Sequence, residues 1–176
     1  HVAGSRDGNN KLCYWLNGVI KYDLDIGSGA YGFASDLAVA GASVYVAGSY
    51  FEDGGYKPCY WLDGTRHDLD IGSGTSGDAN ALAVSDGSVY VAGDYYDGSH
   101  YKPCYWLDGT RHDLDIGSGT EGSASGLAVS GGSVHVAGYY ADGGTKPCYW
   151  FDGVKYDLYI DSGTSGEASA LAVAPR

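Results

Sequence analysis

The chain has 176 residues, 44% of them hydrophobic, which is enough length and apolar content for one packed domain and argues against disorder. Ten Lys and Arg stand against 22 Asp and Glu, so the formal net charge of −12 disfavours nucleic acid and anionic lipid as partners. No apolar run approaches the roughly 20 residues of a transmembrane helix, so we expect no membrane insertion.

One unit of about 45 residues occurs four times along the chain, a repeat length typical of propeller blades. Cysteines at 13, 59, 104 and 148 are separated by 46, 45 and 44 residues, and tryptophans at 15, 61, 106 and 150 keep the same steps. We therefore treat 1–176 as a single repeat domain whose units run over about 1–43, 44–88, 89–133 and 134–176.

Each unit contains four short strand candidates, which in the first complete set are Leu37–Val39, Val44–Gly48, Lys57–Gly64 and Arg66–Ile71. The third ends in Asp-Gly, a dipeptide that tolerates the positive φ angles of a tight hairpin. No window shows the three-and-four spacing of a helical solenoid. The predicted fold class is all-β, a β-propeller of four-stranded antiparallel blades with four repeats in this chain.

The two ends of the chain fall inside one blade. His1–Gly4 matches His135–Gly138, so the chain starts in the second strand of a unit, whereas Leu171–Val173 matches the first strand. We expect blade one to be completed by the C-terminal strand or by a neighbouring chain, because an unpaired strand edge is a liability. A closed four-bladed ring, an eight-bladed ring of two chains and a filament all satisfy this, and a window cut from a longer array would look the same.

The alternation of Val-Tyr-Val-Ala-Gly with Cys-Tyr-Trp-Leu-Asp-Gly resembles the repeats of secreted or surface bacterial β-propeller proteins and, more distantly, WD-type blades. The resemblance covers the whole chain, although the Gly-His and Trp-Asp pairs that mark WD-type blades are not present in that form. It implies a non-catalytic, extracellular or cell-surface role in binding or structure.

The four cysteines occupy one position per unit, which places them on different blades and beyond the roughly 7 Å limit for a disulfide. Each precedes a tryptophan by two residues and so shares its strand face. We predict small buried thiols packed beside the tryptophans, and no paired Cys or His spacing indicates a metal site.

Aromatic residues follow the second strand of each unit, in the hairpin whose length varies most. Variable loops on a fixed scaffold often carry binding, and aromatic faces can stack on sugars. Strand-end packing is the competing explanation. The candidate ligand-binding residues are Tyr50, Phe51, Tyr95, Tyr96, Tyr139 and Tyr140.

Two further patterns contain residue types that could bind a cation or act as an acid–base pair. Asp25, Asp70 and Asp115 precede Gly-Ser-Gly loops and could attract Ca²⁺, but no Asp-x-Asp-x-Asp-Gly loop exists, so we expect no cofactor beyond a weak possibility of Ca²⁺. His67 and His112 each precede an aspartate, yet tyrosine replaces them in the other two units. A catalytic pair is rarely diluted in this way, so we expect no enzyme and assign this position a structural role.

The sequence supports two functional hypotheses. In the first, the chain is a non-catalytic extracellular scaffold whose partners are copies of itself, joined into rings or filaments by strand complementation. In the second, it is a carbohydrate-binding, lectin-like propeller that uses the aromatic loop residues to bind glycans.

Overall fold

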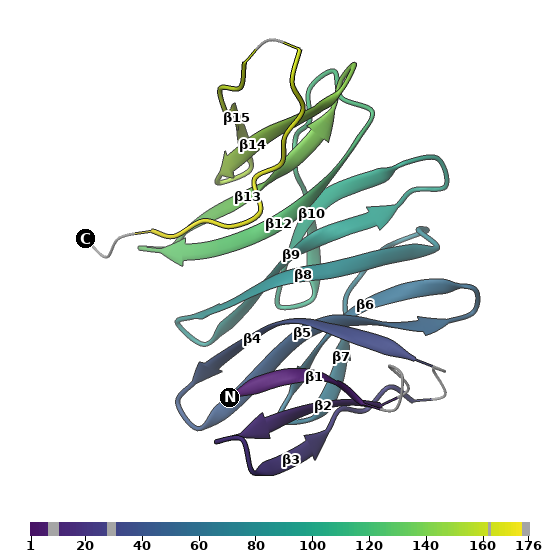
Figure 1. The fold of residues 1–176 in the computed structure, drawn as a ribbon, viewed down its shortest axis with the longest axis vertical. Helices are drawn as coiled ribbons and strands as arrows, with labels where there is room; N and C mark the ends of the chain where they lie inside the picture. Colours follow the sequence, from purple (N-terminus) through teal and green to yellow (C-terminus); the bar gives the residue numbers. More distant parts are fainter. Residues whose placement is uncertain (7–10, 28–30, 162, 174–176) are drawn as a thin grey trace.

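The computed structural model describes residues 1–6, 11–27, 31–161 and 163–173 (Figure 1). Over these residues the chain is made of strands and turns, and none of them forms a helix that could span a membrane. The strands are β1 (Val2–Arg6), β2 (Lys11–Leu16), β3 (Ile20–Asp23), β4 (Gly32–Ala40), β5 (Ser43–Glu52), β6 (Gly55–Leu62), β7 (Thr65–Asp68), β8 (Ser76–Ser85), β9 (Ser88–Tyr96), β10 (Tyr101–Leu107), β11 (Thr110–Asp113), β12 (Glu121–Ser130), β13 (Ser133–Ala141), β14 (Thr145–Phe151) and β15 (Val154–Asp157).

These strands form four antiparallel meanders, which we call blades one to four. Blade one is β1-β2-β3, and the four-stranded blades two, three and four are β4-β5-β6-β7, β8-β9-β10-β11 and β12-β13-β14-β15. Figure 1 shows the blades stacked in sequence order along the long axis, with blade one at the bottom and blade four at the top. The predicted all-β fold of four-stranded antiparallel propeller blades is confirmed.

The predicted Asp-Gly hairpins form as the sequence indicates. Between β6 and β7, Asp63 has φ 49° and Gly64 has φ 89°, the two positive angles of a type I′ turn. The Asp63 carboxylate also accepts a hydrogen bond from the Val44 N–H at 2.8 Å. Asp108 and Asp152 make the same bond in blades three and four, so each turn is tied to the start of its second strand.

A bulge interrupts the pairing of the first two strands in each complete blade. In blade two the register of β4 and β5 shifts between Ala34 and Asp36. Opposite the bulge a Cβ on Gly48 would lie 2.1 Å from the Phe33 carbonyl oxygen, so only glycine fits there. Gly93 and Gly138 meet the same restriction in blades three and four, which explains the glycine at the end of this motif in the three complete blades.

The hydrophobic core lies between neighbouring blades. Each of three buried clusters combines a leucine from one blade with the cysteine and tryptophan of the next. Trp61, Trp106 and Trp150 are 0% exposed. All four cysteines are buried and none is part of a disulfide, which confirms the prediction of unbridged buried thiols. The blades are therefore held together by packing between sheets.

Blade one contains three described strands, and β1 pairs only with β2 among them. Residues 167–173 lie instead against blade four: the Ala168 N–H donates to the Gly138 carbonyl at 3.3 Å, and a Cβ on Gly126 would lie 3.0 Å from Ala170 Cα. This is the place that β8 and β12 take against blades two and three. In this structure the C-terminal strand does not complete blade one of its own chain, and completion by a neighbouring chain stays a prediction.

Candidate functional site

Every described boundary between blades carries the same hydrogen bond. The indole N–H of Trp61 donates to the Asp25 carbonyl at 2.5 Å. Trp106 donates to Asp70 at 2.7 Å, and Trp150 donates to Asp115 at 2.6 Å. A buried indole needs such a partner, because an unpaired buried N–H costs free energy. The tryptophan thus fixes the position of each blade against the one before it.

A cation stacked on a tyrosine forms a second repeated contact. The Arg66 guanidinium lies 4.1 Å from the centre of the Tyr50 ring, and the Lys155 ammonium lies 3.5 Å from the centre of Tyr140. Tyr50 is 3% exposed and Tyr140 is 4% exposed. Burial, with the nearby charge of Asp68 adding to it, raises the pKa of Tyr50 to about 12. Both rings are therefore largely buried, and ligand binding by Tyr50 and Tyr140 stays a prediction.

The other four predicted ligand-binding residues are only partly buried. Phe51 stacks on Tyr31 at 5.0 Å in blade two, and Tyr96 lies 5.2 Å from Tyr101 in blade three. Tyr95 is covered by Arg111 at 3.9 Å. Tyr139 lies in blade four, beside a cavity described below. Ligand binding by Phe51, Tyr95, Tyr96 and Tyr139 stays a prediction.

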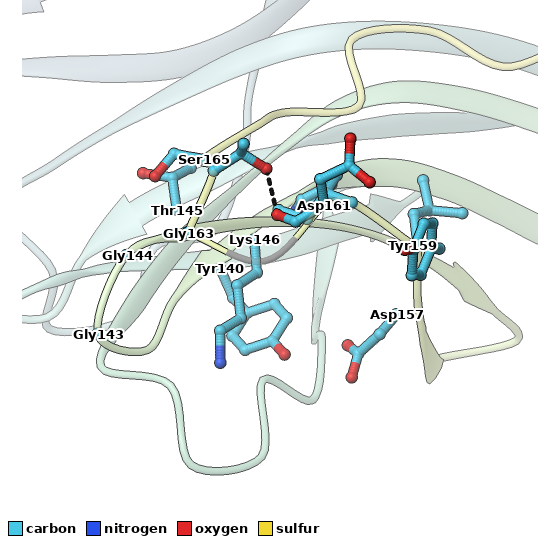
Figure 2. A pocket seen from close by; sticks show the side chains of 14 residues that line it. Tyr140, Gly143, Gly144, Thr145, Lys146, Asp157, Tyr159, Asp161, Gly163 and Ser165 are labelled. Carbon is cyan, nitrogen blue, oxygen red and sulfur yellow. Dashed lines mark hydrogen bonds between the residues drawn. The ribbon is translucent and has the colours of Figure 1, made fainter.

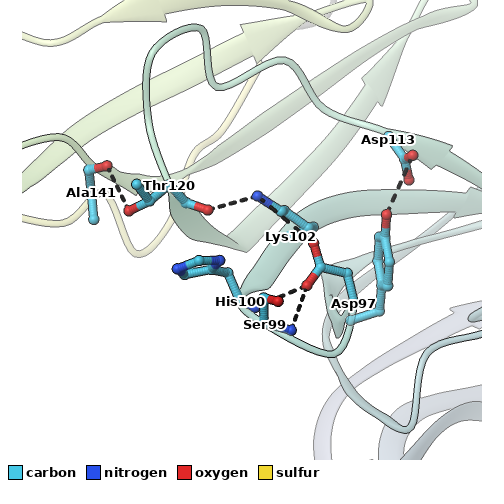
Figure 3. Close-up of polar contacts among 8 residues, drawn as sticks. Asp97, Ser99, His100, Lys102, Asp113, Thr120 and Ala141 are labelled. Atoms are coloured by element: carbon cyan, nitrogen blue, oxygen red, sulfur yellow. Dashed lines mark hydrogen bonds and ion pairs between the residues drawn. The ribbon is translucent and has the colours of Figure 1, made fainter.

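The variable loop between β9 and β10 is shaped by its own polar contacts (Figure 3). The Asp97 carboxylate accepts from the N–H groups of Ser99 and His100 at 2.8 and 2.9 Å, and these bonds lower its pKa. Lys102 reaches across to the Thr120 carbonyl at 2.6 Å, at the start of blade four. The β9–β10 hairpin is therefore held by contacts within its loop and, through Lys102 of β10, by a contact with the start of blade four.

The aspartates considered for Ca²⁺ each shape a local turn. Asp25, Asp70 and Asp115 accept the N–H of the glycine two residues on, at 2.8, 2.7 and 2.8 Å. Within the described part of the chain, no three side chains of His, Cys, Asp or Glu gather in a way that could hold a metal ion.

The histidines considered for acid–base chemistry are stacking partners. His67 stacks on Tyr60 and His112 on Tyr105, both at 4.8 Å between ring centres. In blade one Tyr22 takes the same place on Tyr14 at 4.9 Å. A flat ring is what this position provides, which explains why His and Tyr interchange between units.

The outer side of blade four differs from every other blade face. Its exposed large residues are Phe151, Val154, Tyr156, Leu158 and Tyr159, which we call the end face. Leu158 is 40% exposed, whereas its equivalents Leu24, Leu69 and Leu114 are each 5% exposed under the next blade. The same repeat position is thus buried three times and open once.

A cavity of about 670 Å³ opens beside the end face, between the β13–β14 hairpin and the segment that follows β15. Figure 2 shows Tyr140 and Lys146 on one wall and Tyr159 and Asp161 on the other. Lys146 pairs with Asp142 at 2.9 Å, and the Thr164 hydroxyl donates to the Asp161 carbonyl at 2.6 Å. The cavity wall therefore combines polar and apolar groups beside the end face.

Blade one presents the complementary exposure. Trp15 is partly exposed, although the other three tryptophans are completely buried, and Val2, which pairs with Trp15, is 60% exposed. The repeat pattern predicts the same environment for all four tryptophans. It gave no reason to single out Leu158 or Tyr159 as exposed. One signal was available: Tyr159, which is 90% exposed, stands where the other units have aspartate.

No family model matches this chain, and no curated protein matches it significantly in sequence.

Proposed function

We propose that this protein is a non-catalytic structural repeat protein that associates with copies of itself, blade four of one copy packing on blade one of the next. The observation that carries the proposal is the eightfold difference in exposure between Leu158 at 40% and Leu114 at 5%. Covering the end face would bury apolar surface, and each Å² buried would stabilise the association by about 25 cal/mol. Blade one carries the tryptophan that performs this task at each boundary inside the chain.

The internal boundaries predict the contacts of the joint. The indole of Trp15 would donate to the Tyr159 carbonyl of the neighbouring copy, as Trp150 donates to Asp115. Residues 167–173 of that neighbouring copy would pair with β1. Because Leu127 lies opposite Val136 and Ala124 opposite Gly138, the expected register places Leu171 opposite Val2 and Ala168 opposite Gly4.

This pairing would give β1 an inner neighbour and would supply partners for the backbone groups along its edge. Each added copy presents a new end face, so the contact is heterologous. It yields a ring if the rotation per copy closes and a filament if it does not.

Native mass measurement and electron microscopy of the purified protein over a wide concentration range test the proposal. We expect particles of two or more copies, and Leu158→Asp should return them to single chains, because a charge would be buried in the joint. Val39→Asp is the matched control, since Val39 is 48% exposed in blade two and away from the end face. Single chains at every concentration would contradict the proposal.

A further inference from the structure

One pair of residues departs from the repeat in a costly way. Just before the bulge, the first two strands of blades two, three and four place these residues opposite each other: Phe33 and Ser49, Asp78 and Asp94, Ser123 and Tyr139. Blade three alone puts two carboxyl groups there. Like charges directly opposite on paired strands destabilise a sheet.

The two carboxyl groups are also withdrawn from water. Asp94 is 6% exposed, and the Ser123 hydroxyl donates to it at 2.5 Å. Burial raises the pKa of Asp94 to about 7 against the hydrogen bond from Ser123, and the charge of Asp78 raises it further. Burial likewise raises the pKa of Asp78, one of whose oxygens has no hydrogen-bond partner among the described residues.

The donors nearby are already engaged. The Asn80 amide donates to the Ser123 hydroxyl at 3.2 Å and to the Ala124 carbonyl at 3.0 Å, and Ser123 in turn donates to Asp94. No lysine or arginine belongs to the described residues that line this place. One Asp78 oxygen is left without a hydrogen-bond partner among the described residues, so this wall can accept a further donor.

These groups line a cavity of about 410 Å³ between blades three and four. Its wall also contains Glu121, Tyr139 and Tyr101, the last of which is 41% exposed. The volume falls in the range of about 300–1,000 Å³ that is usual for small-molecule sites. Two tyrosine rings beside converging polar groups provide both an apolar surface and hydrogen-bond acceptors.

Fold stability does not explain the arrangement. Serine occupies the equivalent of Asp94 in blade two, where Ser49 is completely buried and accepts the Ala79 N–H at 3.3 Å. Serine also occupies the equivalent of Asp78 in blade four. The blades thus accept serine at both positions, and a departure that weakens local structure is expected where a site has a function.

We infer that this cavity binds a saccharide residue, whose hydroxyl groups donate to Asp78 and Asp94 and whose apolar face lies against Tyr139. Two neighbouring sugar hydroxyls can both donate to one carboxyl group. They would make the hydrogen bonds that water makes to an exposed carboxyl group. The site lies within a single chain and does not depend on the association proposed above. It includes Tyr139, one of the predicted loop aromatics, and adds the polar residues that differ between repeats.

Saturation-transfer NMR with methyl glycosides of glucose, galactose, mannose and N-acetylglucosamine at millimolar concentration, followed by a glycan array, tests the inference. Asp78→Ser and Asp94→Ser install the side chains that other blades already use. Each should weaken binding about tenfold or more, as expected when a charged hydrogen bond is lost. Tyr50→Phe is the matched control, because it changes an aromatic residue at the predicted loop position and should leave binding intact.

Three outcomes would overturn the inference. They are no binding of any saccharide probe, binding that Asp78→Ser and Asp94→Ser leave unchanged, and binding of putrescine or Ca²⁺ in place of sugars. Thermal unfolding accompanies each measurement. A serine variant that binds less while unfolding at the same or a higher temperature locates the effect in the site, because a loss of fold would lower both.

Discussion

The boundary between blades three and four and the outer side of blade four use the same repeat positions with opposite results. At the boundary, Leu114 is 5% exposed beneath Trp150, which is itself 0% exposed. On the outer side Leu158 is 40% exposed and Tyr159 is 90% exposed. The difference shows that a side chain at this position is buried only when the next blade packs against it, since a single sheet leaves it open to solvent.

Two of the three boundaries inside the chain differ in another respect. Between blades two and three the buried polar residue is Ser49, and between blades three and four it is Asp94. The backbone around them is the same, because Gly48 and Gly93 both lie opposite a bulge. Two substitutions on a constant frame, Asp78 in place of Phe33 and Asp94 in place of Ser49, thus distinguish the boundary that has the candidate ligand site.

The largest expected effect comes from removing a boundary tryptophan. Trp106→Ala should lower the free energy of unfolding by about 3–5 kcal/mol, because it empties a packed site and leaves the Asp70 carbonyl without its donor. Trp15→Ala should cost clearly less in the single chain, about 1–2 kcal/mol, since Trp15 is already partly exposed. Urea unfolding measures both. Equal losses would erase the distinction between inner and outer boundaries.

The paired leucines make the same comparison with one side chain. Leu114→Ala should cost about 2–5 kcal/mol of unfolding free energy, whereas Leu158→Ala should cost about 1 kcal/mol or less in the single chain. Leu158→Ala should also reduce association, which sedimentation detects. If Leu158→Ala destabilised the single chain as much as Leu114→Ala, the end face would already be covered within the molecule.

The stability of the boundary between blades three and four should depend on pH more than that of the boundary between blades two and three. Because folding raises the pKa of Asp94 from its ordinary value near 3.8 to about 7, the folded chain holds a proton that the unfolded chain has lost between these values. The contribution of Asp94 to stability should therefore be fully present below pH 4 and fall by about 2–4 kcal/mol as pH rises to 7. Asp78 and Glu121 are the other carboxyl groups lining this cavity.

Asp94→Ser should remove most of that pH dependence, and Ser49→Asp should introduce a similar one at the boundary between blades two and three. Unfolding free energies at pH 4 and pH 8 measure the change. A wild-type chain that grows more stable across this range would show that Asp94 is not the dominant group.

The smallest expected effect is at the stacked rings. His112→Tyr should change the free energy of unfolding by about 0.5 kcal/mol or less, because Tyr22 already stacks on Tyr14 in the same way. His112→Ala should cost more, since it removes the ring. A large loss with tyrosine would mean that the imidazole has a role beyond stacking.

Most local features were predictable from the sequence. The strands, the type I′ turns and the buried, unbridged cysteines follow from side-chain alternation, Asp-Gly pairs and repeat spacing. Some boundaries were wrong: the last strand of blade two was expected to reach Ile71 and ends at Asp68. There Leu69 turns into the core and its N–H bonds the Pro58 carbonyl at 3.0 Å.

The sites were less predictable. Six aromatic residues near the hairpins looked alike in the sequence, but stacked cations cover Tyr50 and Tyr140 and leave Tyr139 beside a cavity. Departures between repeats were the better signal, because Asp78, Asp94 and Tyr159 all stand out when the units are aligned.

By itself the sequence determined the repeat, the strand and turn chemistry and hence the blade, since each rests on side-chain alternation and backbone preferences within a few residues. Only the tertiary structure decided which faces are covered and which polar groups meet. Asp94 and Ser123 are 29 residues apart in the chain, and they meet because two sheets stack in a fixed register. Leu158 differs from Leu114 for the same reason: exposure depends on the neighbouring blade, which lies outside the local pattern.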